Sequence, residues 1–81
     1  MTVTVKLFAV LRERGGVSEL ELELPAEATV AAARDALAQR IPAIRDYLAR
    51  VAWAVNRAYA SIDQELHDRD ELAVIPPVSG G

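Results

Sequence analysis

Residues 18–24 read SELELEL, a stretch in which three leucines alternate with three glutamates. A period of two is typical of a β-strand that buries one face, so we expect the leucines to point inward and the glutamates toward solvent. Residues 2–8, TVTVKLF, show the same alternation. Gly15 and Gly16 allow the chain to turn between these stretches, which are expected to pair as a hairpin joined by a short irregular or helical segment.

The middle of the chain favours helix. Thr29 is a suitable N-cap for residues 30–41, VAAARDALAQRI, whose apolar side chains recur at helical spacing. Pro42 ends that helix or begins the next one, and residues 42–51 repeat the helical spacing. We therefore expect one longer helix followed by a second short helix.

Strand patterns return in the last third of the chain, at residues 52–56, 58–62 and 72–75, and Asn56 and Arg57 offer a turn between the first two. The last of them, LAVI, has apolar residues on both faces, which is typical of a central strand. The helical segment is long enough for a crossover, so the last strand can lie parallel to the first. This order predicts an α+β fold of the β-grasp, or ubiquitin-like, type: a mixed sheet packed against one or two helices.

Length and composition limit the classes of protein that this chain can belong to. Its 81 residues suffice for one domain, and with 52% hydrophobic but only 5% aromatic residues the core must be aliphatic. A net charge of -3 would repel a phosphate backbone, so nucleic acid is not an expected partner. No apolar run approaches the ~20 residues of a membrane span. The N-terminus has no signal-peptide pattern, and we expect a cytoplasmic protein with no membrane partner.

Metal and nucleophile sites are not expected. The chain has no cysteine and only one histidine, His67, so no set of ligands has metal spacing. The acidic residues of HDRDE, 67–71, are expected to form a solvated turn rather than a catalytic pair. Gly15 and Gly16 lack the Lys-Ser/Thr of a phosphate-binding loop.

The C-terminus has an unusual composition: residues 75–81 read IPPVSGG. Pro76 and Pro77 cannot donate hydrogen bonds to a sheet, so the chain is expected to divide into a domain at residues 1–75 and an extended tail at 76–81. Gly80 and Gly81 have no side chains, which lets the backbone enter a narrow channel. We interpret this tail as a substrate for a partner enzyme.

The terminal carboxylate must be activated before it can react. An α-carboxyl has an ordinary pKa of about 3.3 to 3.7 and is therefore ionised and unreactive at neutral pH. Reaction with ATP would convert Gly81 to an acyl-adenylate. Attack by sulfur would then give a thiocarboxylate, and attack by an amine would give an isopeptide.

The stretches KLFAVLRE (6–13), AVN (54–56) and DRDELAVIPPVSGG (68–81) resemble the MoaD family of ubiquitin-like sulfur carriers, the small subunits of molybdopterin synthase. The likeness covers the whole chain. Family members have glycine where this chain has Arg69, so only the geometry of that turn is in question. The Gly-Gly end is intact.

The resemblance implies a non-catalytic, sulfur-donating subunit. An E1-like enzyme would consume ATP to adenylate Gly81, and a sulfur donor would convert it to a thiocarboxylate. The sulfur would then be delivered to cyclic pyranopterin monophosphate in the large subunit, forming the dithiolene of molybdopterin. The implied assembly is a heterotetramer of two small and two large subunits, and this chain would bind no cofactor of its own.

Docking residues are expected beside the tail. Phe8 and Ile75 fall on the face opposite the core side chains of their strands, and Tyr59 is a third candidate. Burial of Phe8 at the edge of the core is the structural alternative. The resemblance favours docking, because these positions match an apolar contact surface of the family. The predicted partner-binding residues are Phe8, Tyr59, Ile75, Pro76, Pro77, Val78 and Ser79.

Two other functions share the same chemistry. A related sulfur carrier would serve the synthesis of thiazole or cysteine or the thiolation of transfer RNA, and would differ in the acceptor of the sulfur. A protein modifier would instead end with Gly81 joined to a lysine, and would produce conjugates in a cell lysate.

Overall fold

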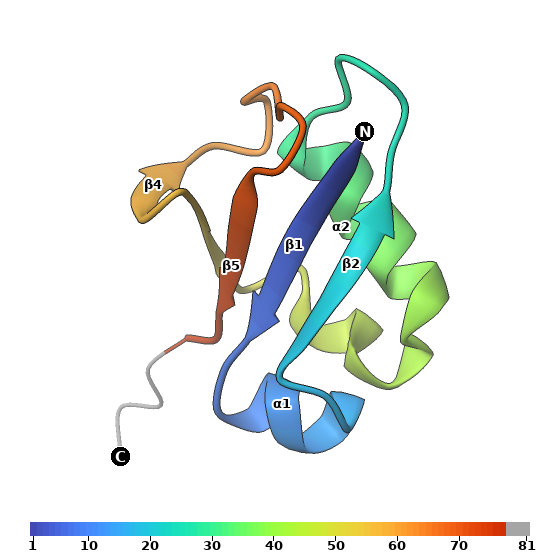
Figure 1. Ribbon diagram of the computed structural model, residues 1–81. Coiled ribbons are helices and arrows are strands. Elements are labelled where there is room, and N and C mark those ends of the chain that lie inside the picture. Colours follow the sequence, from blue (N-terminus) through green and yellow to red (C-terminus); the bar gives the residue numbers. More distant parts are fainter. Residues whose placement is uncertain (78–81) are drawn as a thin grey trace.

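Five strands form one mixed sheet with the order β2-β1-β5-β3-β4 in the computed structural model, which describes residues 1–77 (Figure 1). β1 and β5 run parallel, and the other neighbours are antiparallel. The last strand is therefore central and parallel to the first, as the sequence predicts. The elements are β1 (Thr2–Leu7), α1 (Val10–Gly15), β2 (Glu19–Glu23), α2 (Val30–Arg40), the 3-10 helix η1 (Pro42–Tyr47), β3 (Ala52–Val55), β4 (Ala58–Ala60) and β5 (Glu71–Ile75).

One face of the sheet carries the core. Val5 of β1 lies opposite Leu72 of β5, and both side chains are fully buried. Helices α2 and η1 cover this face and lie behind the sheet in Figure 1. Thr29 caps α2 as expected, because its hydroxyl accepts a hydrogen bond from the Ala32 amide at 3.4 Å. The buried stripe of α2 consists of Val30, Ala33 and Leu37.

Three expected elements differ from the structure. Residues 42–51 do not form an α-helix but a 3-10 helix that ends at Tyr47, and its turns are closed by i to i+3 bonds such as Leu48 N to Arg45 O at 3.1 Å. The predicted strand 58–62 stops at Ala60, because the Ile62 carbonyl instead accepts from the Ala31 amide of α2. The strand within residues 18–24 ends at Glu23.

A tight turn after β1 directs Phe8 outward. Ala9 has φ 50° and ψ -123°, the conformation of the first central residue of a type II′ turn. The Leu11 amide closes the turn on the Phe8 carbonyl at 3.0 Å. Leu7 and Leu11, on either side of this turn, point into the core and are buried. The side chain of Phe8 points away from the core and is 44% exposed.

The turn before β5 is less solvated than its composition predicts. Asp70 is only 9% exposed, which corrects the expectation that all carboxylates of residues 67–71 face water. It accepts hydrogen bonds from Asn56 Nδ2 at 2.9 Å and from the His67 amide at 2.8 Å. Arg69 has φ 68°, a left-handed conformation that glycine adopts more easily.

No helix within residues 1–77 is both long and apolar enough to cross a membrane.

Candidate docking site

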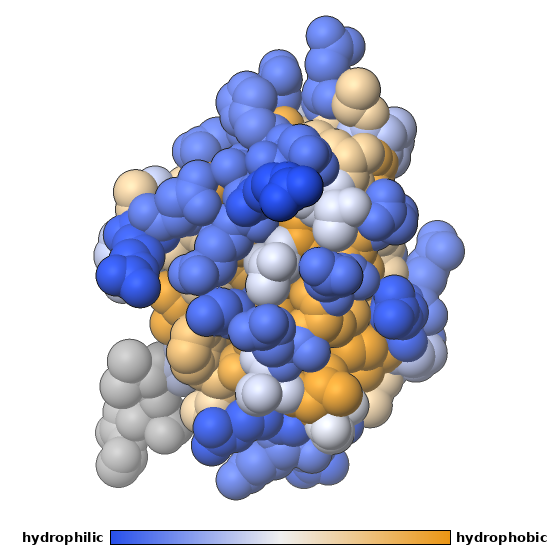
Figure 2. All heavy atoms as spheres, viewed as in Figure 1, coloured by the Kyte–Doolittle hydropathy of each residue, from blue (hydrophilic) through white to orange (hydrophobic). Residues whose placement is uncertain are grey.

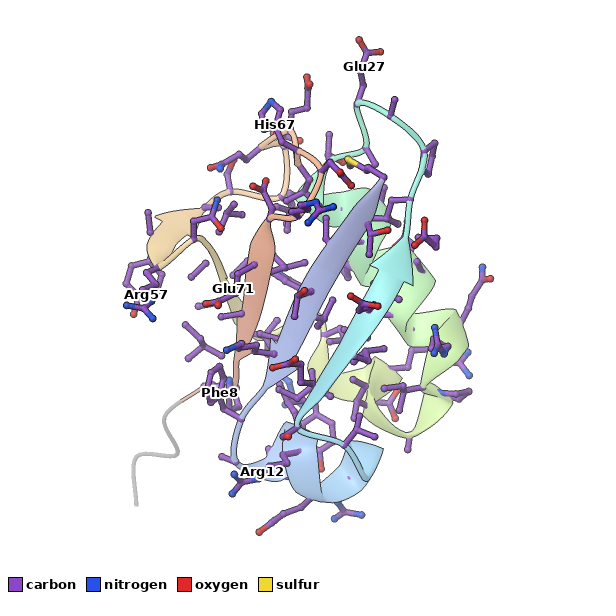
Figure 3. The ribbon with its side chains drawn as sticks, in the orientation of Figure 1. Phe8, Arg12, Glu27, Arg57, His67 and Glu71 are labelled. Atoms are coloured by element: carbon purple, nitrogen blue, oxygen red, sulfur yellow. The ribbon has the colours of Figure 1, made fainter. Side chains whose placement is uncertain are left out.

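A hollow of about 550 Å³ lies on the face of the sheet that the helices leave open. It collects side chains from four strands and two turns, which places residues that are far apart in the sequence around one depression. Figure 3 shows Phe8 beside the end of β5 and Arg57 at the tip of the β3–β4 hairpin. The lining residues are Lys6, Phe8, Ala54, Arg57, Tyr59, Glu71, Ala73 and Ile75.

The floor of the hollow is formed by small side chains. Ala73 of β5 pairs with Ala54 of β3, and Ala54 pairs in turn with Tyr59 of β4. Paired residues share a face of the sheet, so these side chains form one row. Alanines in the two central positions allow a partner's side chain to approach the sheet closely.

Larger apolar side chains stand at the edge of this floor. Leu7 lies opposite Val74, so the residues that follow them, Phe8 and Ile75, lie next to each other at the strand ends. Tyr59 is 80% exposed and Phe8 44%, and because both line the same hollow they mark it as a candidate interaction surface. Figure 2 shows smaller apolar areas at the lower left, beside the end of β5, while its largest hydrophobic area lies right of centre over β2 and is separate from the hollow.

Charged residues border the hollow on one side. Lys6 Nζ lies 3.5 Å from Glu71 Oε2 and 3.8 Å from Glu19 Oε1. Both pairs are partly exposed, so each contributes no more than about 1 kcal/mol to stability. The outward side chains of β2, paired with β1, add further negative charge at Glu21 and Glu23.

The structure brings three of the predicted docking residues, Phe8, Tyr59 and Ile75, around one hollow. Pro76 and Pro77 directly follow β5, and Pro77 is exposed. The remaining predicted site residues, Val78, Ser79, Gly80 and Gly81, lie outside the described residues.

Sequence reasoning missed the floor and the charged rim of the hollow. Ala73 had a usable signal, because it alternates with the core residues Leu72 and Val74 and must therefore face outward. Arg57 and Glu71 had no usable sequence signal, since their approach to the hollow depends on how the β3–β4 hairpin is placed against β5.

His67 lies on the loop that precedes β5, and its ring nitrogens are 3.9 Å from carboxylate oxygens of Glu65 and Asp70. In Figure 3 it is at the opposite end of β5 from Phe8.

The hollow offers a shallow apolar surface with a polar border, which suits protein docking. Among the residues that line it, only Lys6, Arg57 and Glu71 are charged, and Lys6 and Glu71 are already paired. An exposed aromatic rim around a small-residue floor is the kind of surface that buries well in a protein interface.

Comparisons with known proteins identify the family of this chain. The model of the ThiS family matches residues 5–81. The chain is 38% identical to a molybdopterin synthase sulfur carrier subunit of Arabidopsis thaliana, over 98% of this chain and 82% of the relative. It is 41% identical to the subunit of the same name from Chlamydomonas reinhardtii, over the whole of both chains.

Solved structures have the same fold. The crystal structure of SAMP1 from Haloferax volcanii superposes with a TM-score of 0.89 at 32% identity, over the whole of both chains. A putative molybdopterin converting factor, subunit 1, from Pyrococcus furiosus superposes with a TM-score of 0.86 at 38% identity, over 96% of this chain and 99% of that chain. The β-grasp fold of the sulfur carriers is therefore shown.

Proposed function

The chain belongs to the ThiS family, and we propose that it is the sulfur carrier subunit of a molybdopterin synthase. The observation that carries this function is the likeness, over essentially the whole chain, to curated relatives that all bear this name. The Gly-Gly end of the sequence supplies the group that such a carrier needs.

The proposed reaction begins at the carboxylate of Gly81. One of its oxygens attacks the α-phosphorus of ATP, pyrophosphate leaves, and an acyl-adenylate forms. Sulfide supplied by a donor then attacks the carbonyl carbon and AMP leaves, which gives the thiocarboxylate without any change of oxidation state. The E1-like enzyme holds the nucleotide in this scheme, so the chain itself binds no cofactor.

Sulfur transfer takes place in the active site of the large subunit. The thiocarboxylate sulfur of Gly81 attacks a carbon of cyclic pyranopterin monophosphate and displaces an oxygen substituent. Water then cleaves the acyl–sulfur bond, which leaves the sulfur on the pterin and returns Gly81 to its carboxylate. A second carrier repeats these steps and completes the dithiolene of molybdopterin. The catalytic side chains belong to the large subunit, and this chain contributes the sulfur and a docking surface. We propose a heterotetramer of two small and two large subunits, working in the cytoplasm.

The geometry of the described residues supports docking near the point where the tail begins. β5 lines the hollow and ends at Ile75, immediately before Pro76 and Pro77. A partner seated on Phe8, Tyr59 and Ile75 would therefore contact the chain close to the point where its tail begins. Since proline restricts the backbone, Pro76 and Pro77 would limit the directions in which the tail can leave the docked surface.

Intact mass spectrometry tests this function. The chain is incubated with ATP, the E1-like enzyme and a sulfur donor, and we expect a mass gain equal to the replacement of one oxygen atom by sulfur. The matched control carries one extra alanine after Gly81, which displaces the carboxylate and should prevent the gain. No mass gain in the wild-type chain, with an activating enzyme that works on another carrier, would contradict the proposal.

The same experiment separates the alternatives. Adding the large subunit and cyclic pyranopterin monophosphate should return the chain to its original mass and produce molybdopterin. A carrier for thiazole, cysteine or transfer RNA would keep its sulfur under these conditions. A modifier would appear as conjugates of higher mass in a lysate probed for this chain.

A further inference from the structure

The turn that joins β3 to β4 has an arginine where its geometry favours glycine. Asn56 and Arg57 are the two central residues, with φ 49° and φ 71°. A two-residue hairpin turn with both values positive is of type I′, for which Asn-Gly is the preferred pair. Asn56 fits the first position, whereas Arg57 occupies the second against this preference.

Hydrogen bonds to β5 hold this turn in place. The Asn56 amide donates to the Glu71 carbonyl at 2.8 Å, and the Glu71 amide donates to Asn56 Oδ1 at 2.9 Å. The Asn56 side chain also donates to Asp70 Oδ1 at 2.9 Å. An unfavourable backbone conformation persists where the surroundings fix it in this way. The position of Arg57 on the rim of the hollow is therefore set by the fold.

Arg57 differs in its charge environment from the other cation of the hollow. Lys6 lies between two carboxylates, Glu19 and Glu71. Arg57 is exposed and makes no ion pair with any residue of the described part, 1–77. Figure 3 shows it at the end of the hairpin that lies farthest from β2, whose outward side chains are glutamates. The open face is thus acidic along β2, whereas at the hairpin it carries the guanidinium of Arg57, which has no carboxylate partner within residues 1–77.

We propose that Arg57 is a specificity-determining residue of the docking surface and pairs with a carboxylate of the large synthase subunit. This inference rests on the proposed function. The large subunit would place an apolar side chain on the floor of Ala54 and Ala73 and an Asp or Glu beside it, within reach of Arg57. A guanidinium can hold a carboxylate through two parallel hydrogen bonds, which fixes orientation as well as charge.

Two glycine variants form a matched test. Arg57→Gly and Arg69→Gly each remove one exposed arginine from a left-handed position, with φ 71° and φ 68°. Both changes relieve the backbone, so both variants should unfold at a slightly higher temperature than the wild-type chain. Arg69 does not line the hollow, and instead borders a polar depression with Thr2 and Thr4. Only Arg57→Gly should therefore change docking.

The measurement is the Kd for the purified large synthase subunit at two concentrations of sodium chloride. We expect Arg57→Gly to weaken binding by about fivefold at low salt, the loss of one partly exposed ion pair, and to reduce the salt dependence of Kd. Arg69→Gly should bind like the wild-type chain. Arg57→Glu, which sets two negative charges against each other, should weaken binding further than Arg57→Gly.

Equal Kd values for the two glycine variants, or an unchanged salt dependence for Arg57→Gly, would overturn the role of Arg57. These results would leave the carrier function standing if the wild-type chain binds the large subunit and delivers sulfur to it. A wild-type chain that neither binds the large subunit nor delivers sulfur would overturn the proposed function together with this inference.

Discussion

Phe8 shows how a single residue can be placed for binding rather than for stability. It is flanked by buried leucines at positions 7 and 11, yet the turn at Ala9 sends its ring to the open face of the sheet. An alanine held in this sparsely populated positive-φ conformation costs the folded state about 1 to 3 kcal/mol. The buried side chains on either side offset that cost, and the exposed ring contributes little to the core.

Replacing Phe8 by aspartate should therefore weaken docking without unfolding the domain. We expect Phe8→Asp to raise the Kd for the large subunit by about ten- to a hundredfold, because the change removes a large apolar contact and brings an unpaired charge into the interface. Val17→Asp is the matched control, since Val17 is 40% exposed, close to the 44% of Phe8, but does not line the hollow. Isothermal titration calorimetry and circular dichroism of both variants provide the comparison. Equal loss of binding in the two would refute a specific role for Phe8.

At the scale of elements, the β3–β4 hairpin depends on a side-chain clamp as well as on its strand pairing. β4 has only three residues and pairs with β3 alone, at the edge of the sheet. The side chain of Asn56 joins the turn to Asp70 and to the Glu71 amide, at the beginning of β5. Tyr59 and Arg57, which both line the hollow, are therefore positioned through this clamp.

Asp70→Ala should destabilise the protein by about 2 to 3 kcal/mol, because it leaves two donors, Asn56 Nδ2 and the His67 amide, without their acceptor. Urea denaturation measures this loss. Asp68→Ala is the control: its carboxylate accepts from the Thr2 amide at 2.8 Å, but at an exposed position, so its loss should stay below about 1 kcal/mol.

A double-mutant cycle tests the clamp itself. Asn56→Gly removes the side chain while keeping a residue that tolerates positive φ. Combined with Asp70→Ala, its effect should be smaller than the sum of the two single effects, by about 1 kcal/mol. Strict additivity would show that Asn56 and Asp70 stabilise the fold independently.

At the scale of the whole molecule, stability and chemistry lie in separate parts of the chain. All buried core residues of the described part lie between Val3 and Val74, whereas the carboxylate that we propose to react belongs to Gly81. In the proposed function, the folded domain would supply a docking face and the last residues would supply the group that reacts.

Deleting residues 78–81 should therefore leave the thermal unfolding midpoint unchanged and abolish sulfur loading. A deletion that starts at Val74 is the contrasting case, since it removes a fully buried side chain from the central strand. That longer deletion should cost at least about 2 kcal/mol of stability. Differential scanning calorimetry and intact mass measure the two properties separately. Sulfur loading of the variant that lacks residues 78–81 would show that the reactive group lies elsewhere.

Much of this architecture can be predicted from local sequence patterns. The alternation in residues 2–7 and 19–23 specifies which side chains enter the core, because a strand turns each successive residue to the opposite face. The apolar residues of LAVI, 72–75, predict a central strand, and the Gly-Gly end indicates the chemistry. Each of these features depends on neighbouring residues alone. The length of η1 was less predictable, because the apolar spacing that predicts a helix does not distinguish 3-10 from α geometry.

The docking face depends instead on how distant segments pack. Phe8, Tyr59 and Ile75 surround one hollow because β5 lies between β1 and β3, and the strand register aligns their positions. Asp70 is buried in a turn of polar composition because Asn56, 14 residues away, supplies a donor. Such contacts bring together residues with no shared local pattern, so only the packed sheet specifies them.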